Sequence, residues 1–235
     1  VESDFIRIER GISRINLKLK SIDGTEINGA GPDISPERVE ELMEKLDSLK
    51  EGDVLFLAGS IPASMPDDMY ERIMKRLEGR GVMTVVDATK DLLVKVLKYH
   101  PFLVKPNNHE LGEIFGVELK TREDVVPYGK KLQEMGAENV LISMAGEGAV
   151  LIAANGQVYK KPVPTGTLVN GVGAGDSMVA GFMAGWMEKR DYRHAFYMGI
   201  AAGSASAFSE NLATGKEVEA VYRQVAGQKQ EGENI

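Results

Sequence analysis

The chain has 235 residues, a length that suits one large α/β domain, or one domain with a small appendage, and leaves little room for two full cores. Cysteine is absent, which excludes thiol catalysis, cysteine-zinc sites and a disulfide scaffold. The 28 basic and 35 acidic side chains give a net charge of −7, which lacks the broad basic surface of nucleic-acid binding proteins. No apolar run approaches the roughly 20 residues of a membrane helix, and the acidic start does not resemble a signal peptide. We expect a cytoplasmic protein that binds neither nucleic acid nor membrane.

The first part of the chain predicts a β-hairpin that leads into a helix. Residues 6–28 mix apolar and polar side chains on both sides of an Asp-Gly pair, a dipeptide that favours tight hairpin turns. A Ser-Pro pair at residues 35–36 is typical of a helix start, and apolar side chains recur at helical spacing up to residue 49. Residues 54–58 are an unbroken apolar run, which predicts a strand that is buried on both faces.

The rest of the chain alternates strand-length apolar runs with helical periodicity, an order that is typical of a parallel sheet with right-handed crossovers. We expect strands at residues 82–86, 102–104 and 140–142, with helices that include residues 70–77, 92–97 and 109–115 and one that Thr121 caps. An Asn-Gly pair between two apolar runs predicts an antiparallel hairpin at residues 149–160, and residues 174–225 have helical periodicity. The predicted fold class is α/β, with a doubly wound, mostly parallel sheet and helices on both faces.

Ligands of open α/β sheets bind at the carboxyl ends of the strands, so the loops that leave the strands are the candidate sites. The strongest is Asn-Gly-Val-Gly-Ala-Gly-Asp-Ser at residues 170–177, which leads directly into an apolar helix. It matches neither the Walker pattern nor the dinucleotide fingerprint, but its glycines let backbone N–H groups face an anion at a helix N-terminus. An acid beside such a site suits a general base, and we assign that role to Asp176. The alternative is an ordinary first-turn acid that stabilises the helix dipole.

Three other strand exits carry weaker signals. Asn107 and Glu110 suit either oxygen ligation of a hydrated Mg²⁺ or an ordinary capping box. Residues 143–148 suit close approach to nucleotide phosphates, although a strand-to-strand turn explains them nearly as well. Ser60 offers a hydroxyl after the strand at residues 54–58, where a plain turn is the simpler explanation. None of the three histidines has the spacing of a zinc motif, and we expect them in solvent or packed on helices.

Taken together and in this order, these motifs resemble the ribokinase and phosphofructokinase-B family of sugar kinases, over nearly the whole chain up to about residue 225. The resemblance implies a ribokinase-like fold with a small β-hairpin lid. It divides the chain into part of that lid at residues 6–30, an α/β kinase domain for nucleotide and sugar at residues 31–226, and a flexible tail at residues 227–235.

The resemblance also implies roles for individual residues. The family's Gly-Ala-Gly-Asp signature supplies the anion hole and catalytic base, which correspond to Gly173, Ala174, Gly175 and Asp176. The implied nucleotide-binding residues are Ser143, Ala145, Gly146, Gly148, Asn107 and Gly175, and Glu110 is the implied metal residue. The implied substrate-binding residues are Arg14, Asn16, Ser60, Lys105 and Asp176. The implied cofactors are ATP and Mg²⁺. Of the substrate residues, Arg14 suits a phosphate because a guanidinium binds it bidentately, and the alternative is an exposed strand cation.

Within the family, the segments at residues 13–17, 26–29, 58–62 and 104–107 are most similar to 1-phosphofructokinases and tagatose-6-phosphate kinases. This implies ATP-dependent phosphorylation of fructose 1-phosphate to fructose 1,6-bisphosphate, with tagatose-6-phosphate kinase activity as an alternative. A non-catalytic sensor of sugar phosphate or nucleotide is a second alternative, although a pure binder has no use for an acid at position 176. The missing fingerprint disfavours a nicotinamide-dependent oxidoreductase.

One departure from the family pattern concerns the start of the sequence. The family opens with a strand that carries a substrate aspartate, followed by a Gly-Gly-Lys-Gly segment, and nothing in this sequence matches either. We therefore expect a fragment with an incomplete sugar pocket. The implied partners are ATP and a phosphorylated ketohexose, and the free edges of a lid hairpin favour a homodimer through residues 12–28.

Overall fold

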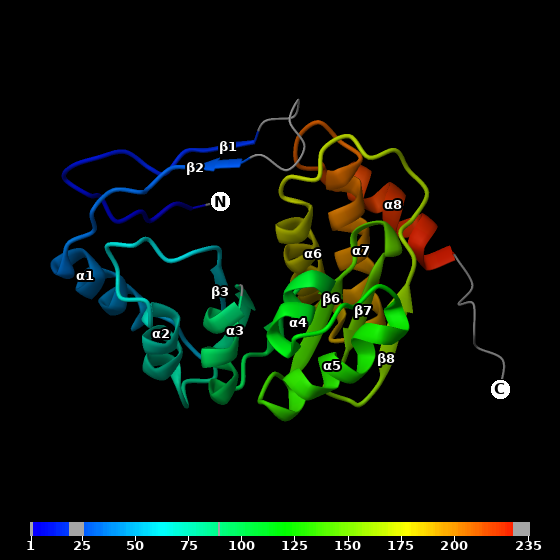
Figure 1. Cartoon of the computed structure of the whole chain (residues 1–235), viewed down its shortest axis with the longest axis horizontal. Helices are drawn as coiled ribbons and strands as arrows, with labels where there is room; N and C mark the ends of the chain where they lie inside the picture. The colour runs from blue at the N-terminus through cyan, green and yellow to red at the C-terminus, as the bar shows by residue number, and fades with distance from the viewer. Residues whose placement is uncertain (1, 19–25, 89, 228–235) are drawn as a thin grey trace. The chain divides into compact units, whose positions relative to one another are not determined.

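The structure is a computed structural model that describes residues 2–18, 26–88 and 90–227. The chain divides into two compact units, Val1–Thr84 and Val85–Ile235. The first contains β1 (Asn16–Lys18), β2 (Glu26–Asn28), α1 (Pro36–Leu46), β3 (Val54–Ala58) and α2 (Met69–Leu77), and β4 (Met83–Asp87) leads from it into the second (Figure 1). The second contains α3 (Lys90–Val96), η1 (Leu97–Tyr99), β5 (Leu103–Val104), α4 (Asn108–Phe115), α5 (Arg122–Glu134), β6 (Asn139–Ser143), η2 (Ala145–Glu147), β7 (Ala149–Ile152), β8 (Val158–Lys161), α6 (Ala174–Lys189), α7 (Tyr192–Ala207) and α8 (Gly215–Gly227).

The predicted hairpin is confirmed as the antiparallel pair β1 and β2, and its turn lies outside the described residues. Leu17 lies opposite Ile27, and Asn16 lies opposite Asn28. Because side chains alternate between the faces of a strand, this small sheet has one apolar and one polar face. Leu17 and Ile27 are both more than half exposed, at 51% and 56%.

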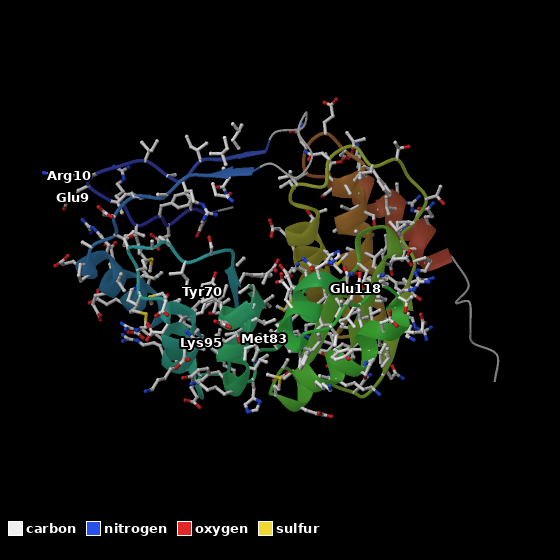
Figure 2. All side chains as sticks on the ribbon, in the orientation of Figure 1. Glu9, Arg10, Tyr70, Met83, Lys95 and Glu118 are labelled. Carbon is white, nitrogen blue, oxygen red and sulfur yellow. The ribbon has the colours of Figure 1, made fainter. Side chains whose placement is uncertain are left out.

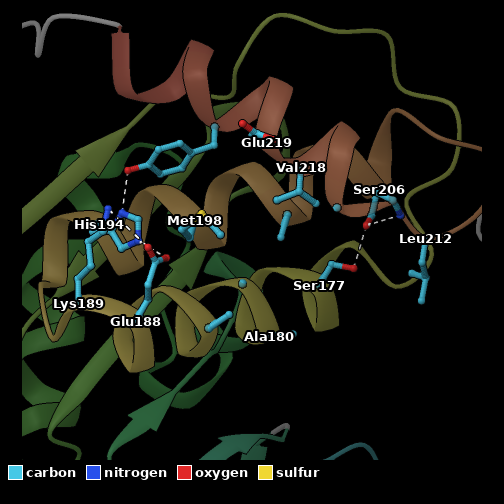
Figure 3. Close-up of a pocket in the computed structure, with 16 residues that line it drawn as sticks. Ser177, Ala180, Glu188, Lys189, His194, Met198, Ser206, Leu212, Val218 and Glu219 are labelled. Carbon is cyan, nitrogen blue, oxygen red and sulfur yellow. Dashed lines mark hydrogen bonds and ion pairs between the residues drawn. The ribbon is translucent and has the colours of Figure 1, made fainter. Parts of the chain in front are cut away.

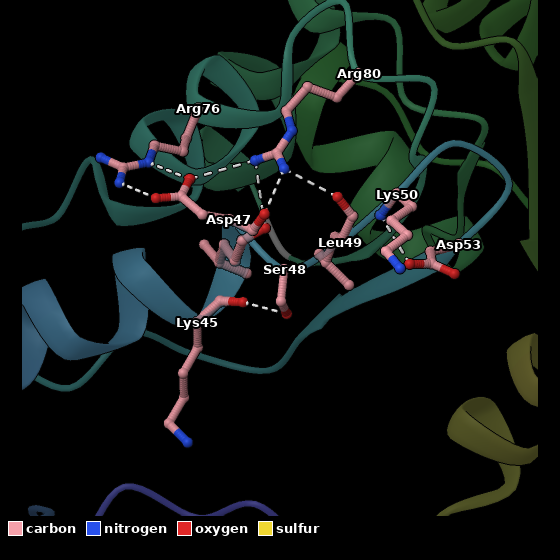
Figure 4. Close-up of polar contacts among 9 residues, drawn as sticks. Lys45, Asp47, Ser48, Leu49, Lys50, Asp53, Arg76 and Arg80 are labelled. Atoms are coloured by element: carbon pink, nitrogen blue, oxygen red, sulfur yellow. Dashed lines mark hydrogen bonds and ion pairs between the residues drawn. The ribbon is translucent and has the colours of Figure 1, made fainter.

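An ion-pair network joins α1 to α2 in the first unit (Figure 4). Asp47 ends α1 and accepts a hydrogen bond from Arg76 Nε at 2.9 Å. The guanidinium of Arg80 donates to the carbonyls of Asp47 (2.6 Å) and Leu49 (2.9 Å), which would otherwise lack partners at the helix end. The hydrogen bond from Arg76 holds the pKa of Asp47 below its usual range. The C-terminus of α1 is therefore fixed by side chains of α2 and the turn after it.

Residues 54–58 form β3 as predicted, but the prediction that this strand is buried on both faces is wrong. Only Leu57 is buried, and the Phe56 side chain is 44% exposed. Among the described residues the strand order is β3-β4-β5-β6-β7-β8, so β3 lies at one edge of this six-stranded sheet. An unbroken apolar run does not distinguish an edge strand from a central one. The turn after β3 is held by the Tyr70 hydroxyl of α2, which donates to the Gly59 carbonyl at 3.1 Å. Figure 2 labels Tyr70 among the side chains of this unit.

The sheet of the second unit is mixed, as predicted. Strands β4, β5 and β6 are parallel, and β6, β7 and β8 are antiparallel neighbours. Successive side chains of β8 point to opposite faces of the sheet and contact different helices. Lys160 pairs with Glu123 of α5, whereas the ring of Tyr159 packs against Phe196 of α7. Helices α5 and α7 therefore cover opposite faces of the sheet (Figure 1).

Glycines allow α6 and α7 to pack closely against each other. A Cβ on Gly181 would lie 2.6 Å from both Ala202 Cβ and the Met198 carbonyl oxygen, and one on Gly203 would lie 3.0 Å from the Ala174 carbonyl oxygen. The predicted helices after residue 174 are confirmed, and α8 ends at Gly227, beyond which the predicted flexible tail lies outside the described residues. None of the helices among residues 2–18, 26–88 and 90–227 has the length and apolar character to cross a membrane.

Candidate active site

The glycine-rich segment forms the open N-terminus of α6, as predicted. Gly173 precedes the helix with φ at +78°, a left-handed conformation that favours glycine. The Ser177 N–H donates to the Gly173 carbonyl at 2.8 Å and starts the helical ladder. The N–H groups of Gly175 and Asp176 lie in the first turn, where a helix leaves donors without intrahelical acceptors. This turn therefore offers the positive end of the helix dipole to an anion.

The loop before α6 is held by its own side chains. Asn170 Oδ1 accepts from the Val172 N–H at 3.1 Å, and Asn170 Nδ2 donates to the Glu210 carbonyl at 3.0 Å. Asp176 is exposed in the first turn of the helix that this loop starts. A carboxylate in this position is accessible to a reacting hydroxyl, which general-base chemistry requires.

An ion pair at the ends of two parallel strands lies beside the first turn of α6. Val86 and Val104 are partners in the register of β4 and β5, so the next residues, Asp87 and Lys105, leave the sheet side by side. Lys105 Nζ lies 3.1 Å from Asp87 Oδ1, and Lys105 is only 6% exposed. A Cβ on Gly175 would lie 3.4 Å from Lys105 Nζ. The ammonium group therefore lies against the first turn of α6, where a phosphoryl group would need it.

The charges around Asp87 define the electrostatics of the site. Burial raises the pKa of the Asp87 carboxyl, and this effect outweighs the Coulombic attraction and hydrogen bond from Lys105. The negative charges of Asp176 and Glu110 raise the pKa of Asp87 further. Three carboxylates and one ammonium thus lie within electrostatic range of one another at the carboxyl ends of β4 and β5. A site with this surplus of acids favours a polyphosphate that arrives with a divalent cation.

Asn107 and Glu110 form the capping box that was one of the two interpretations of their spacing. Asn107 Oδ1 accepts from the Glu110 N–H at 2.8 Å, and Glu110 Oε2 accepts from the Asn107 N–H at 2.8 Å. The described residues contain no group of three or more His, Cys, Asp or Glu side chains arranged to hold a metal ion. Magnesium that arrives with a nucleotide needs only one or two carboxylates, because phosphates and water fill its other positions. Glu110 and Asp87 fit that requirement.

The loop at residues 143–148 lies beside the Asn107 turn. Asn107 and Ser143 form a parallel bridge, and the Ser143 N–H donates to the Pro106 carbonyl at 3.2 Å. The loop then makes the 3₁₀ turn η2, in which Ala145 has φ at +45°. The structure thus brings Asn107, Glu110, Lys105, Ser143 and the α6 N-terminus to the carboxyl ends of consecutive strands.

The candidate substrate residues of the first unit also meet. Arg14 Nη1 donates to Ser60 Oγ at 2.7 Å, although the two residues are 46 positions apart. Both are exposed, and Asn16 lies on the polar face of the β1–β2 sheet. An exposed guanidinium beside a hydroxyl is a suitable pair of donors for a phosphate group.

A model of the pfkB family carbohydrate kinases matches residues 1–219. The chain belongs to this family. Among curated relatives, the 1-phosphofructokinase of Bacillus subtilis (strain 168) is 50% identical over 216 residues, which are 92% of this chain and 71% of that protein. The D-tagatose-1-phosphate kinase of Bacillus licheniformis is 36% identical over 217 residues, covering 90% of this chain and 69% of that protein.

Solved structures show that this pfkB kinase has the expected ribokinase-like fold. Phosphofructokinase-2 from Escherichia coli in complex with fructose-6-phosphate superposes with a TM-score of 0.79 at 22% identity, covering 91% of this chain and 70% of that one. Arabidopsis thaliana ribokinase complexed with ribose and ATP gives a TM-score of 0.66 at 19% identity, covering 85% and 65%.

Sequence reasoning missed Asp87 in this pfkB kinase. The signal was present, because Asp87 follows a predicted strand directly and therefore leaves the sheet at its carboxyl end. It was overlooked because a single acid after a strand has no motif around it. Only the pairing of Lys105 with it at the neighbouring strand end makes it recognisable as a site residue.

A second polar cluster lies in a groove of about 690 Å³ between α6, α7 and α8 (Figure 3). His194 is buried there, with Nε2 3.0 Å from Glu188 Oε2 and Nδ1 2.7 Å from Tyr222 Oη. The hydrogen bond with His194 lowers the pKa of Glu188, and burial raises the pKa of Tyr222. The expectation that His194 packs on a helix is confirmed, and its partners show that it joins the three helices.

Proposed function

We propose that the chain transfers the γ-phosphoryl group of ATP-Mg to the 6-hydroxyl of fructose 1-phosphate and produces fructose 1,6-bisphosphate. The observation that carries the proposal is the placement of Asp176 in the open first turn of α6, beside the ammonium of Lys105. A carboxylate and an anion site in one turn are what phosphoryl transfer to a hydroxyl requires. The 50% identity to a 1-phosphofructokinase supports the choice of sugar.

In this mechanism Asp176 accepts the proton of the attacking 6-hydroxyl. A bond forms between the hydroxyl oxygen and the γ-phosphorus, and the bond from that phosphorus to the bridging oxygen of ADP breaks. The N–H groups of Gly175 and Asp176 and the Lys105 ammonium bind the negative charge of the transferring group. Glu110 and Asp87 are the residues that would hold a Mg²⁺ ion bound with ATP, and the ion would supply positive charge to the polyphosphate.

We assign nucleotide binding to the loop at residues 143–148 together with Asn107. The parallel bridge between Asn107 and Ser143 supports this, because it places two strand-exit loops next to each other. Gly146, which is exposed and has open space around it, allows a phosphate to approach the backbone closely, and Gly148 lets the end of the loop pack against β8. Ala145 contributes to the same turn with its positive φ.

We assign recognition of the sugar phosphate to Arg14, Ser60 and Asn16, with residues 6–30 as part of a lid on the kinase domain at residues 31–226. The hydrogen bond between Arg14 and Ser60 supports the pairing of these donors. The exposed apolar face that Leu17 and Ile27 form supports a homodimer through this hairpin.

A second candidate substrate is a tagatose phosphate. The curated relative from Bacillus licheniformis is named for D-tagatose 1-phosphate, whereas the sequence interpretation favoured the 6-phosphate as its alternative. An assay of ADP release from ATP-Mg decides between the candidates when it is run with fructose 1-phosphate, both tagatose phosphates, fructose 6-phosphate and no sugar. Where the chain turns over, we expect the highest kcat/KM with fructose 1-phosphate, and a higher value with a tagatose phosphate would reassign the substrate. Turnover with none of the sugars would point to the incomplete sugar pocket that the sequence predicts.

The role of Asp176 is tested by Asp176→Asn. We expect kcat to fall by about 10²–10⁴-fold while the affinity for ATP stays nearly unchanged, because the variant keeps the shape but not the base. The matched control is Asp91→Asn, which changes another first-turn acid, in α3. If both variants keep most of the wild-type kcat, Asp176 is an ordinary helix-terminal acid and the general-base role is wrong.

A further inference from the structure

The backbone of the loop at residues 143–148 adopts two unusual conformations. Ala145 has φ at +45°, a left-handed conformation that residues with a side chain rarely adopt. Gly148 has φ at +92° and ψ at −130°, a region that is almost restricted to glycine. Such conformations persist only when the surrounding structure holds them. The contacts that hold this loop therefore decide whether it keeps the shape that binds phosphate.

The buried end of the loop is held by the sheet and its neighbours. Met144 is 4% exposed, and its N–H donates to the Gly148 carbonyl at 2.9 Å. A Cβ on Gly148 would lie 2.0 Å from the Lys161 carbonyl oxygen, so this residue is wedged against β8. The part between them, residues 145–147, is exposed. The Glu147 N–H donates to the Met144 carbonyl at 2.9 Å inside the loop, and a tie from another element would add to this hold.

Arg122 of α5 supplies such a tie. Its Nη1 donates to the carbonyl of Glu147, the last residue of the 3₁₀ turn η2, at 2.6 Å. The carbonyl at the C-terminal end of a turn lacks a partner within the turn, and the partial negative charge there favours a cation. The contact is a charge-assisted hydrogen bond, a class that is stronger than neutral ones.

The base of the Arg122 side chain is itself fixed. Arg122 is the first residue of α5, directly after Thr121, whose hydroxyl accepts from the Asp124 N–H at 3.2 Å. Asp124 Oδ2 accepts from the Thr121 N–H at 2.8 Å and completes a capping box. Glu123 then pairs with Lys160 of β8 at 3.2 Å. The start of α5 is thus bound to the edge of the sheet, and Arg122 reaches from a rigid support.

We propose that Arg122 is a positioning residue for the nucleotide, which holds residues 145–147 in the conformation that receives the phosphates. This inference rests on the proposed kinase function. Arg122 acts through the Glu147 carbonyl and not on the reacting atoms. Its removal therefore weakens nucleotide binding and leaves the rate of the chemical step unchanged once the nucleotide is saturating.

The test compares Arg122→Ala, Arg122→Lys and the control Lys130→Ala, which removes an exposed cation from the same helix. Calorimetry measures binding of a non-hydrolysable ATP analogue with Mg²⁺ to the full chain. We expect Kd to rise about five- to tenfold in Arg122→Ala, to recover in part in Arg122→Lys and to stay unchanged in Lys130→Ala. In turnover with fructose 1-phosphate, KM for ATP should rise by the same factor and kcat should change less than twofold.

Amide hydrogen exchange separates positioning from general destabilisation. We expect faster exchange in Arg122→Ala only at residues 143–148, with the unfolding midpoint of the chain unchanged. Exchange that increases throughout α5 and the sheet would overturn the proposal in favour of a structural role. If the wild-type chain binds the analogue and Arg122→Ala binds it equally well, the positioning role is wrong and the kinase function stands. If the wild-type chain binds no nucleotide, the kinase function fails, and the inference fails with it.

Discussion

The ion pair between Asp87 and Lys105 allows a quantitative test of the site. Coulomb's law with an effective dielectric constant of about 20 gives about 5 kcal/mol for unit charges at the 3.1 Å of this pair. At Asp87 the loss of water outweighs this attraction, because burial raises the pKa of the carboxyl more than Lys105 lowers it. Asp87→Asn keeps the shape and removes the charge. The ammonium of Lys105, which is 6% exposed, then has no carboxylate of the described residues at hydrogen-bond distance. Because the pKa of Asp87 is raised, its charged form is not net stabilising in the folded chain, and we expect the free energy of unfolding at pH 7 to change by less than about 1 kcal/mol.

Removing the cation of the pair, in Lys105→Met, predicts a change in how the stability of the chain depends on pH. In Lys105→Met the group that lowers the pKa of Asp87 is gone, while burial, Asp176 and Glu110 still raise it. A carboxyl whose pKa is higher in the folded than in the unfolded state binds its proton more tightly when folded, so stability rises as pH falls through the folded pKa. We therefore expect Lys105→Met to gain stability relative to wild type between pH 7 and about pH 4, the unfolded value of an aspartate.

Urea unfolding followed by the fluorescence of Trp186 measures both effects. Trp186 is the only tryptophan of the chain, and its ring stacks on Tyr192 at 4.6 Å in the same unit as the ion pair. An Asp87→Asn variant that loses about 3 kcal/mol or more would show that the attraction of Lys105 outweighs the burial of Asp87, and would refute this reasoning. A stability curve for Lys105→Met that runs parallel to wild type from pH 7 to pH 4 would refute the assigned cause of the raised Asp87 pKa.

Two further predictions concern the nucleotide loop and the first unit. Gly148→Ala should lower the free energy of unfolding by about 3 kcal/mol or more, because the added Cβ meets the Lys161 carbonyl at 2.0 Å in a conformation that glycine alone adopts readily. Gly146 has open space around it, so Gly146→Ala should change the free energy of unfolding by less than about 0.5 kcal/mol. Equal denaturant midpoints for the two variants would contradict this. Asp47→Ala should lower the thermal midpoint at pH 7 by removing the acceptor of Arg76. Because the pKa of Asp47 is lowered, its contribution to stability is lost as pH falls below about 4, and the thermal midpoints of wild type and variant should converge there. A difference between the two midpoints that stays constant down to pH 3 would contradict the ion pair.

Much of the fold could be predicted because local patterns and tertiary structure agree. The hairpin around the Asn-Gly pair at residues 155–156 appears as β7 and β8, and Thr121 caps α5 as expected. The exposure of β3 could not be predicted, because burial depends on what lies beside a strand and not on its own residues. The position of a strand in the sheet order is a property of the whole chain.

Some parts of the candidate site could likewise be predicted from the sequence, and others could not. The N-terminus of α6 could be located from sequence, because an anion site at a helix start is encoded in consecutive residues. The pairs Asp87–Lys105 and Arg122–Glu147 join positions far apart in the chain, and a single sequence contains no signal for such contacts. Asn107 and Glu110 show the converse case: their spacing was compatible with two roles, and the capping box that formed leaves the carboxylate charge within range of Asp87.

Glycines have two different roles around α6, one at its N-terminus and one at its contact with α7. The glycines before and in its first turn open the backbone to an anion, whereas Gly181 and Gly203 let α6 and α7 approach until a Cβ would meet backbone or side-chain atoms of the partner. At the same end, Ser206 of α7 donates to the Ser177 hydroxyl at 2.9 Å. The turn that carries Asp176 is therefore held by close packing behind it and by a hydrogen bond beside it. In the proposed mechanism, a rigid first turn would keep the base and the anion-binding N–H groups in fixed relative positions, which is the condition for stabilising charge that appears only during the transfer.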